Sequence, residues 1–341
     1  MSARARSARD EAGRPRIAIS LGDPSGVGPE VTAAALGQLP GVTPLVFGDA
    51  AAAELLAAAG LSLPVISPGD PLPAGGALVA VTRLAPRDRR PGKPAARGGA
   101  AQLAYVEVAF EAVRCGHAAA LCTAPVSKAQ VARSLPGFVG HTEWLEARFP
   151  RARSVMMLAC ERLRVALVTN HLALARVPRA VTAARVAATI AVTFRALRDD
   201  FGIARPRLAL CALNPHAGEQ GAFGDEEARV LSPALARARR AGARAEGPFP
   251  ADGLMLGAAT GRWDALVACY HDQGLVPVKL LDALGDPAVN VTLGLPIVRT
   301  SPDHGTAYDL AGTGRARPDS MVAALRMAAE VAARRSGLTP R

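Results

Sequence analysis

Three of the six histidines follow short apolar segments typical of buried strands. His171 follows RVALVTN, His216 follows RLALCALNP, and His271 follows DALVACY and opens the sequence HDQG. In open α/β sheets, ligands bind at the carboxyl ends of the strands. Three neutral imidazoles at three such ends predict a site for one divalent cation, with coordination positions left for a substrate. The alternative is that each histidine only satisfies a loop hydrogen bond. The spacings of 45 and 55 residues match no short metal-binding motif, so they do not decide between the two interpretations.

Lysine is rare in this chain and marks further candidates for proton transfer. Only Lys93, Lys128 and Lys279 are lysines among the 40 basic residues. A lysine ammonium is compact and can lose its proton, whereas a guanidinium cannot. Lys279 lies eight residues after His271, and Asp272 follows that histidine directly. Asp272 and Lys279 are therefore the two candidate catalytic bases, with chance occurrence as the alternative for any one lysine.

Four other residues are of types that recognise anions. The stretch VNVTLGLPIVRTSPDHG contains Asn290 and Arg299, an amide and a guanidinium that can grip a carboxylate or phosphate. His141 and Thr142 begin the predicted helix of GHTEWLEA, where backbone N–H groups favour anions. By contrast, the glycine-rich GDPSGVGPE has neither the GK[ST] of a P-loop nor the GxGxxG pattern, so it predicts a tight strand-to-helix turn.

The hydrophobic pattern predicts an α/β fold. Stripes at helical spacing occupy residues 103–113 and 186–197, and they alternate with short apolar runs. This alternation favours a largely parallel sheet covered on both faces. The breaker-rich region from 67 to 99 is predicted to be an irregular excursion. Buried strands are predicted at residues 16–20, 43–48, 118–124, 164–170, 207–214 and 264–270.

The composition excludes several classes of protein. No apolar run approaches the roughly 18 residues of a membrane span, and residues 1–15 lack the apolar core of a signal peptide and predict a disordered basic tail. The net charge of +11 raises nucleic-acid binding as a possibility. However, the basic residues are scattered and aromatic residues make up only 4%, so a solvated basic surface is the preferred interpretation. Five cysteines without a CxxC pair indicate a reducing compartment, with the cytoplasm as the default.

Six blocks of sequence together resemble one known family. They are GDPSGVGPE, TAPVSK, GHTEWL, LNPHAGEQGAFGDEE, YHDQGLVPVK and VNVTLGLPIVRTSPDHGTAYDLAG, in the order that the family shows, between about residue 16 and about residue 335. The family is that of the NAD-dependent 4-hydroxythreonine-4-phosphate dehydrogenases of pyridoxal phosphate synthesis. The resemblance implies the fold of the isocitrate and isopropylmalate dehydrogenases, which has two α/β/α lobes, a central cleft and no Rossmann fingerprint. It implies a first lobe of residues 16–135 plus about 300–341 and a second of about 136–299.

The resemblance also implies roles for individual residues. The family's metal ligands fall on His171, His216 and His271. A homodimer with active sites shared between subunits is implied, with NAD or NADP as cofactor and one Zn, Co or Mg ion per site. Asn170, Ala173 and Gly253 depart from the usual pattern, which bears on the substrate. The substrate-binding residues fall on His141, Thr142, Lys279, Asn290 and Arg299, and the cofactor loop on His304, Gly305, Thr306 and Ala307.

The expected reaction is oxidation of a secondary alcohol by NAD⁺ with a divalent metal as Lewis acid, while Asp272 or Lys279 accepts the proton. The β-keto acid would then lose CO₂, and 4-phosphohydroxy-L-threonine would yield 3-amino-2-oxopropyl phosphate. Related dehydrogenases acting on threonate or erythronate 4-phosphate, or on an aromatic dihydrodiol, are the alternatives within the fold. A non-redox metallohydrolase or a basic binding module would each leave part of these residues unexplained.

Overall fold

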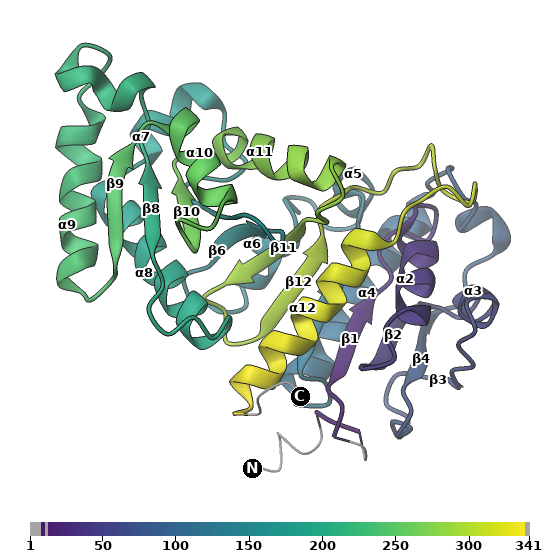
Figure 1. Cartoon of the computed structure of the whole chain (residues 1–341). Helices are drawn as coiled ribbons and strands as arrows, with labels where there is room; N and C mark the ends of the chain where they lie inside the picture. The colour runs from purple at the N-terminus through teal and green to yellow at the C-terminus, as the bar shows by residue number, and fades with distance from the viewer. Residues whose placement is uncertain (1–7, 11–12, 338–341) are drawn as a thin grey trace. The chain divides into compact units, whose positions relative to one another are not determined.

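The computed structural model describes residues 8–10 and 13–337. The chain forms two compact units: unit 1 is Met1–Phe149 with Pro296–Arg341, and unit 2 is Pro150–Leu295. Figure 1 shows both, coloured along the chain.

Unit 1 is a parallel sheet with helices on both faces. Its strands lie in the order β3-β4-β2-β1-β5-β12, and each neighbouring pair is parallel. Helix α4 packs on one face, and α2 and α12 cover the other (Figure 1). The strands are β1 (Arg16–Ser20), β2 (Thr43–Asp49), β3 (Val65–Ile66), β4 (Ala77–Thr82), β5 (Ala120–Thr123) and β12 (Val298–Pro302). The helices are α2 (Gly28–Gly37), α3 (Ala52–Ala58), η1 (Pro86–Asp88), α4 (Ala96–Arg114), α5 (Lys128–Val131), α6 (His141–Glu146) and α12 (Asp319–Arg335).

Unit 2 has its strands in the order β11-β6-β7-β10-β8-β9. β6 runs antiparallel to β11 and β7, and the other pairs are parallel. The strands are β6 (Val155–Ala159), β7 (Arg164–Leu167), β8 (Leu208–Cys211), β9 (Ala245–Phe249), β10 (Ala265–Ala268) and β11 (Val289–Leu293). The helices are η2 (Leu174–Arg176), α7 (Val177–Ala180), α8 (Ala183–Asp199), η3 (Pro215–Gly221), η4 (Glu227–Leu231), α9 (Ser232–Arg240), α10 (Ala251–Ala259) and α11 (His271–Ala283).

The alternation of side chains along β8 explains why its sequence is apolar throughout. Leu208 and Leu210 join the core beneath α8 and α9. Ala209 and Cys211 point to the opposite face and join the core beneath α10 and α11. A strand buried on both faces has no reason to alternate with polar residues, so it reads as one continuous hydrophobic run.

The α/β class and the six predicted strands are confirmed. The other six strands were not anticipated, and one of them, β4, lies inside the stretch predicted to be irregular. β4 is buried only over its first half. The largely parallel order is confirmed, and β6 is the antiparallel exception, because the neighbouring β7 follows it by a short reversal that leaves no room for a crossover helix.

The boundaries of the units differ from those inferred from the sequence. The break lies after Phe149 and not near residue 135. The reason is aromatic packing, because the rings of Trp144 and Phe149 meet the ring of Phe110 on α4 edge to face, at centroid distances of 5.7 and 5.8 Å. His141 and Thr142 therefore belong to unit 1.

Part of the predicted disordered tail is ordered. Asp10 is buried and accepts hydrogen bonds from the Thr43 hydroxyl, at 2.7 Å, and from the backbone N–H of Arg14, at 2.8 Å. These contacts attach residues 8–10 and 13–15 to the start of the sheet. Residues 1–7 and 11–12, on which the rest of this prediction falls, lie outside the described residues.

No single helix within residues 8–10 and 13–337 is long and apolar enough to cross a membrane, and one pair bent by 87°, Leu174–Ala180 with Ala183–Asp199, would pass by length and composition alone.

Gly274 brings α11 close to the sheet of unit 2. A Cβ at this position would lie 2.8 Å from both Leu167 Cδ2 and Val165 Cγ1, two buried side chains of β7. Cores packed to this density leave such side chains little room to move. The glycine of HDQG therefore fixes how closely α11, which begins with His271, approaches β7.

We expect Gly274→Ala to destabilise the protein by about 1–3 kcal/mol, because the added methyl group overpacks the core. Gly253 in α10 is the matched control, since nothing lies within 4 Å of its Cβ position. Gly253→Ala should stabilise by about 0.5–1 kcal/mol, the usual gain for a glycine in a helix. Urea denaturation of both variants checks this, and a stabilised Gly274→Ala protein would contradict the packing argument.

Candidate functional site

His171 and His271 lie beside each other in unit 2. Their ring centroids are 5.4 Å apart, with the ring planes inclined at 42°. His171 follows β7, and His271 is the first residue of α11, three residues after β10 ends. Because β7 and β10 are neighbouring parallel strands, their carboxyl ends bring the two imidazoles together. The structure therefore places two of the three predicted histidines, His171 and His271, side by side.

Side-chain hydrogen bonds hold these strand ends in place. Gln273 accepts from the backbone N–H of Cys269 and donates from Nε2 to the carbonyl oxygen of Ala212, both at 2.7 Å. The Thr169 hydroxyl donates to the carbonyl oxygen of Cys269 at 2.8 Å. The segments that follow β7, β8 and β10 are thus joined to one another just before each histidine.

His216 lies on an unusual turn. Five consecutive residues, from His216 to Gln220, have φ between 40° and 80°, so the chain forms a left-handed turn. Only Gly218 among them is a glycine, and the left-handed conformation costs roughly 1–2 kcal/mol for each of the others. The exposed imidazole of His216 lies near Phe223, with ring centroids 6.1 Å apart.

The three histidines do not all meet within one chain. Within the described part of the chain, no group of three or more His, Cys, Asp or Glu side chains is placed to hold a metal ion. The reason is local, because the left-handed turn carries the His216 side chain out toward Phe223 and solvent. One chain therefore offers a two-imidazole group and a separate third histidine.

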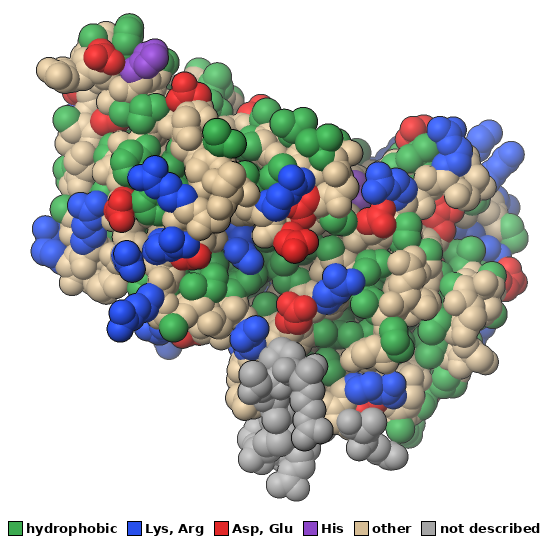
Figure 2. All heavy atoms as spheres, viewed as in Figure 1, with side chains coloured by type: hydrophobic (Ala, Val, Ile, Leu, Met, Phe, Trp, Pro, Cys, Tyr) green, Lys and Arg blue, Asp and Glu red, His purple; other side chains and the backbone are tan. Residues whose placement is uncertain are grey.

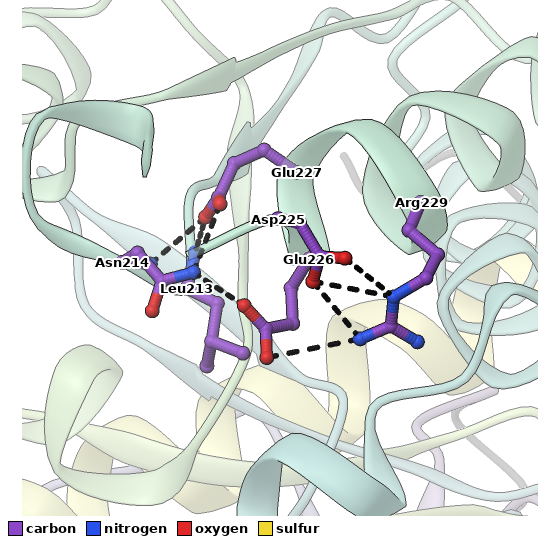
Figure 3. A network of polar contacts seen from close by, with 6 residues as sticks. All are labelled: Leu213, Asn214, Asp225, Glu226, Glu227 and Arg229. Atoms are coloured by element: carbon purple, nitrogen blue, oxygen red, sulfur yellow. Dashed lines mark hydrogen bonds and ion pairs between the residues drawn. The ribbon is translucent and has the colours of Figure 1, made fainter. Parts of the chain in front are cut away.

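A carboxylate network supports the beginning of this turn (Figure 3). Glu227 Oε1 accepts from the backbone N–H groups of Leu213 and Asn214, each at 2.8 Å. The Asn214 side-chain amide donates to Glu227 Oε2 at 2.9 Å and to Glu226 Oε2 at 2.7 Å. Burial raises the pKa of Glu227, but these hydrogen bonds outweigh it and hold the pKa below its ordinary value. Glu227 is consequently an ionised, buried acceptor.

The other unit 2 candidates lie on α11 and β11. Asp272 accepts a hydrogen bond from His271 through a 2.7 Å contact between Oδ1 and Nδ1, and its own side chain is largely exposed. Lys279 is exposed two turns further along the same helix. Asn290 is half-buried on β11. Asp272 is therefore placed to orient the His271 ring.

The unit 1 candidates Arg299 and His141 are in contact. Arg299 on β12 is only 3% exposed. Its Nη2 donates to the Thr123 hydroxyl at 2.8 Å and lies 3.4 Å from Nδ1 of His141. Thr142 follows His141 in α6, and both side chains are half-buried. The structure thus brings a guanidinium and an imidazole from distant parts of the sequence into one group.

Burial and positive charge shape the ionisation of this group. Burial, together with the charges of Arg299 and Lys128, lowers the pKa of His141 well below its ordinary value. Burial also lowers the pKa of Arg299 to about 10, opposed by Cys122 and Glu143. At neutral pH His141 is a neutral imidazole beside two cations, an environment that favours binding of an anion.

The predicted cofactor loop is attached to the glycine-rich turn of the same unit. Thr306 accepts through its carbonyl oxygen from the N–H of Val27 at 2.9 Å. The Tyr308 hydroxyl donates to Asp23 at 2.6 Å. A Cβ at Gly26 would lie 2.9 Å from the carbonyl oxygen of Thr306, so only glycine allows this approach. The sequence GDPSGVGPE therefore supports the loop that contains His304, Gly305, Thr306 and Ala307.

Three of the predicted binding residues have buried polar atoms with no hydrogen-bond partner among the described residues. These atoms are Nε2 of His141, Oδ1 of Asn290 and Nε2 of His304. A buried polar atom without a partner costs free energy and calls for an explanation, such as a ligand. The predicted binding residues are thus the kind of positions at which a ligand would supply the missing hydrogen bond.

Comparison with known families agrees with the motifs. The sequence profile of the family described as "Pyridoxal phosphate biosynthetic protein PdxA" matches residues 41–328. The chain belongs to the PdxA family. It is similar to the 4-hydroxythreonine-4-phosphate dehydrogenase of Geobacter metallireducens, with 49% identity over 333 residues that cover 94% of this chain and 96% of the relative. The corresponding enzyme of Paracoccus denitrificans is 44% identical over 324 residues, which cover 94% and 98%.

Solved structures agree with the PdxA assignment. The 4-hydroxythreonine-4-phosphate dehydrogenase of Klebsiella pneumoniae superposes with a TM-score of 0.78 at 35% identity, covering 93% of this chain and 99% of that one. A terephthalate 1,2-cis-dihydrodiol dehydrogenase of Burkholderia xenovorans gives 0.64 at 29% identity, covering 96% and 99%. The family resemblance is therefore confirmed, and the chain is a dehydrogenase of a family of pyridoxal phosphate biosynthesis.

Sequence reasoning missed residues that support the site. Gln273 and Glu227 lie within the quoted motifs YHDQGLVPVK and LNPHAGEQGAFGDEE, but their hydrogen bonds join segments distant in the sequence. Asp23 lies likewise in GDPSGVGPE and receives the Tyr308 hydroxyl. An amide or carboxylate close to a strand end was the available signal for such a supporting residue. Its hydrogen-bond partners could not be predicted, because they are distant in the sequence.

We expect the depressed pKa of His141 to make stability depend on pH. The folded pKa lies below the unfolded value, so the unfolded chain binds the proton first as the pH falls. The stabilising effect is complete above the ordinary histidine range and is lost as the pH falls through it, with a slope of up to about 1.4 kcal/mol per pH unit.

Urea denaturation between pH 7 and 5 checks this expectation. His141→Gln should flatten the decline in the free energy of unfolding, because glutamine does not titrate. His117→Gln is the matched control, since His117 is exposed in the same unit, and it should follow the parent protein. Equal slopes for all three proteins would show that His141 is not held neutral.

Proposed function

We propose that this dehydrogenase oxidises 4-phosphohydroxy-L-threonine with NAD⁺ and a divalent metal, giving a β-keto acid that decarboxylates to 3-amino-2-oxopropyl phosphate. The substrate is inferred from the relatives, which are named 4-hydroxythreonine-4-phosphate dehydrogenases. One geometric observation supports the chemistry most directly, namely the contact of His171 and His271 at the ends of neighbouring strands. A reducing compartment such as the cytoplasm suits the free cysteines.

The residues of one chain bring together two of the three donors of the proposed metal site. Two imidazoles with centroids 5.4 Å apart suit Zn or Co better than Mg, which prefers oxygen ligands. Asp272, in contact with Nδ1 of His271, would fix the ring that binds. The third donor that we propose is His216 of a second copy of the chain, because within one chain His216 is exposed on its own turn.

The surface of unit 2 supports association of two copies. Val276, Leu280 and Leu284 lie at intervals of four residues on α11 and its end and are 60–68% exposed, so they form an apolar stripe. Figure 2 shows hydrophobic side chains over this helix. Phe223, beside His216, is 54% exposed. Exposed apolar surface of this kind favours a protein partner, and a homodimer would bury it next to the histidines.

We propose that Arg299, His141 and Thr142 bind anionic groups of the substrate. For Lys279 and Asn290 we propose the same role from the family resemblance alone. Arg299 is held rigidly by Thr123 and presents a planar guanidinium. His141 is neutral and offers an unpartnered Nε2. These groups suit a phosphate and a carboxylate.

When bound, the metal supplies Lewis-acid polarisation of the substrate hydroxyl and NAD⁺ or NADP supplies the hydride acceptor. The chain's own part is to bind, orient and accept a proton. Asp272 or Lys279 accepts the hydroxyl proton, since both lie on α11, which begins with His271. The loop of His304, Gly305, Thr306 and Ala307 would hold the cofactor, and the unpartnered Nε2 of His304 is the observation that fits it.

Formation of NADH tests the proposal, with 4-phosphohydroxy-L-threonine, threonate 4-phosphate, erythronate 4-phosphate and a cis-dihydrodiol offered separately in the presence of Co²⁺. The highest kcat/KM should fall on 4-phosphohydroxy-L-threonine. Preference for the dihydrodiol, the second candidate because of the terephthalate dihydrodiol dehydrogenase relative, would overturn the substrate assignment. Reduction of NAD⁺ by none of the four would overturn the reaction.

A shared site predicts complementation between two inactive variants. His171 and His271 come from the same chain, so the informative pair is His216→Ala with His271→Ala. A mixed dimer would have one site lacking both histidines and one intact site. Random assortment makes half of the dimers mixed, so the mixture should regain roughly a quarter of full activity. His171→Ala mixed with His271→Ala should regain none, and recovery by that mixture would contradict the arrangement.

Arg299→Lys should raise KM for the phosphorylated substrate at least about ten-fold, because lysine keeps the charge but loses the fork that grips an oxyanion. The kcat of Arg299→Lys should change by a smaller factor than its KM. Arg317→Lys serves as the control, since Arg317 is an exposed arginine of unit 1 that pairs with Asp319. Steady-state kinetics measure both, and an unchanged KM would mean that the guanidinium does not contact the substrate.

A further inference from the structure

The left-handed turn that carries His216 needs a support, and the candidate is a buried carboxylate that lies outside the predicted site residues. Glu227 is 7% exposed and begins the π-helical turn η4. Its Oε1 accepts from both backbone donors that precede Pro215, those of Leu213 and Asn214. The other two residues between the end of β8 and His216 need no such acceptor. The N–H of Ala212 donates to the carbonyl oxygen of Phe249, and Pro215 has no N–H.

Glu227 also lies close to Gly218, the middle residue of the turn. A Cβ on Gly218 would lie 2.8 Å from Glu227 Oε2 and 2.8 Å from the carbonyl oxygen of Gly224. The carboxylate therefore fits against the one glycine within the five left-handed residues. Strained backbone of this kind persists only where its surroundings over-determine it. Here one side chain accepts from Leu213 and Asn214, which lead into the turn (Figure 3), and its Oε2 lies close to Gly218 in the middle of the turn.

We propose that Glu227 is a positioning residue that holds the His216 turn in its left-handed form and thereby sets the metal affinity of the shared site. This inference rests on the proposed function, in which His216 is a metal ligand. Glu227 itself contacts neither metal nor substrate. It acts through the backbone of Leu213 and Asn214 and through the space beneath Gly218.

Glu227→Gln tests the carboxylate with little change of volume. Its amide nitrogen would face the donating Asn214 Nδ2, so one hydrogen bond is replaced by two opposed donors. Asp225→Asn is the matched control, because it removes the same charge only two residues from Glu227. The Asp225 carboxylate contacts the exposed Arg229 and not the turn. Both variants are made in the full chain and compared with the parent protein.

Two measurements separate positioning from mere structural support. In the metal-free protein, hydrogen–deuterium exchange of residues 213–224 should be at least ten-fold faster in Glu227→Gln and unchanged in Asp225→Asn. Titration with Co²⁺ should give a Kd about 10–100-fold weaker for Glu227→Gln, the usual range for residues that orient a ligand. Its kcat at saturating Co²⁺ should stay within about three-fold of the parent value. Faster exchange with an unchanged Kd would overturn the proposal, because the role would then be structural only.

A glycine pair tests the same contact from the side of the turn and remains available if Glu227→Gln fails to fold. Gly218→Ala places a methyl group against Glu227, whereas Gly221→Ala, also at positive φ, meets nothing within 4 Å. Gly218→Ala should weaken Co²⁺ binding at least ten-fold, and Gly221→Ala by less than about three-fold. Equal effects would overturn the proposal, because strain alone would then explain both.

His216→Ala distinguishes failure of the inference from failure of the proposed function. If His216→Ala binds Co²⁺ as tightly as the parent protein, the proposed metal site is wrong and the inference falls with it. If His216→Ala loses binding while Glu227→Gln and Gly218→Ala keep it, the metal site stands and only the role of Glu227 is refuted.

Discussion

The side-chain amide of Gln273 joins the ends of β8 and β10, and the arrangement of the histidines depends on it. One amide holds the N–H of Cys269 and the carbonyl oxygen of Ala212, while Thr169 adds the end of β7. With the strand ends joined, His171 and His271 meet at 5.4 Å. Gly274 completes the constraint, because it lets α11 lie against β7 without a Cβ between them. The four residues of HDQG thus supply the proposed ligand His271, the carboxylate in contact with its ring, the amide that joins the strand ends and the glycine that allows close packing.

Hydrophobic periodicity was sufficient to predict the α/β class and the strands that lead to each histidine. The strands β4, β6 and β11 were not anticipated, although their sequences ALVAVT, VMMLA and VNVTL are largely apolar. The boundary after Phe149 depends on Phe110 packing against Trp144 and Phe149. Such contacts between segments distant in the sequence leave no periodic signal.

The candidate site was predictable in its residue types and only partly in its geometry. Strand ends correctly predicted the meeting of His171 with His271, because parallel neighbours end at one edge. The position of His216 depends on a left-handed turn of mostly non-glycine residues, a conformation that propensity disfavours. The contact of Arg299 with His141 depends on β12 lying beside β5, which no local pattern encodes. Local rules therefore fail where backbone strain or long-range pairing forms the site.

The central claim is that the two imidazoles of one chain and the His216 imidazole of another surround a single divalent ion. X-ray absorption spectroscopy of the Co²⁺-loaded protein tests this claim most directly, because scattering from imidazole rings counts the histidine ligands. The account predicts three imidazoles around the metal in the parent protein and two in His216→Ala. Two imidazoles in the parent protein, or three retained in His216→Ala, would contradict it.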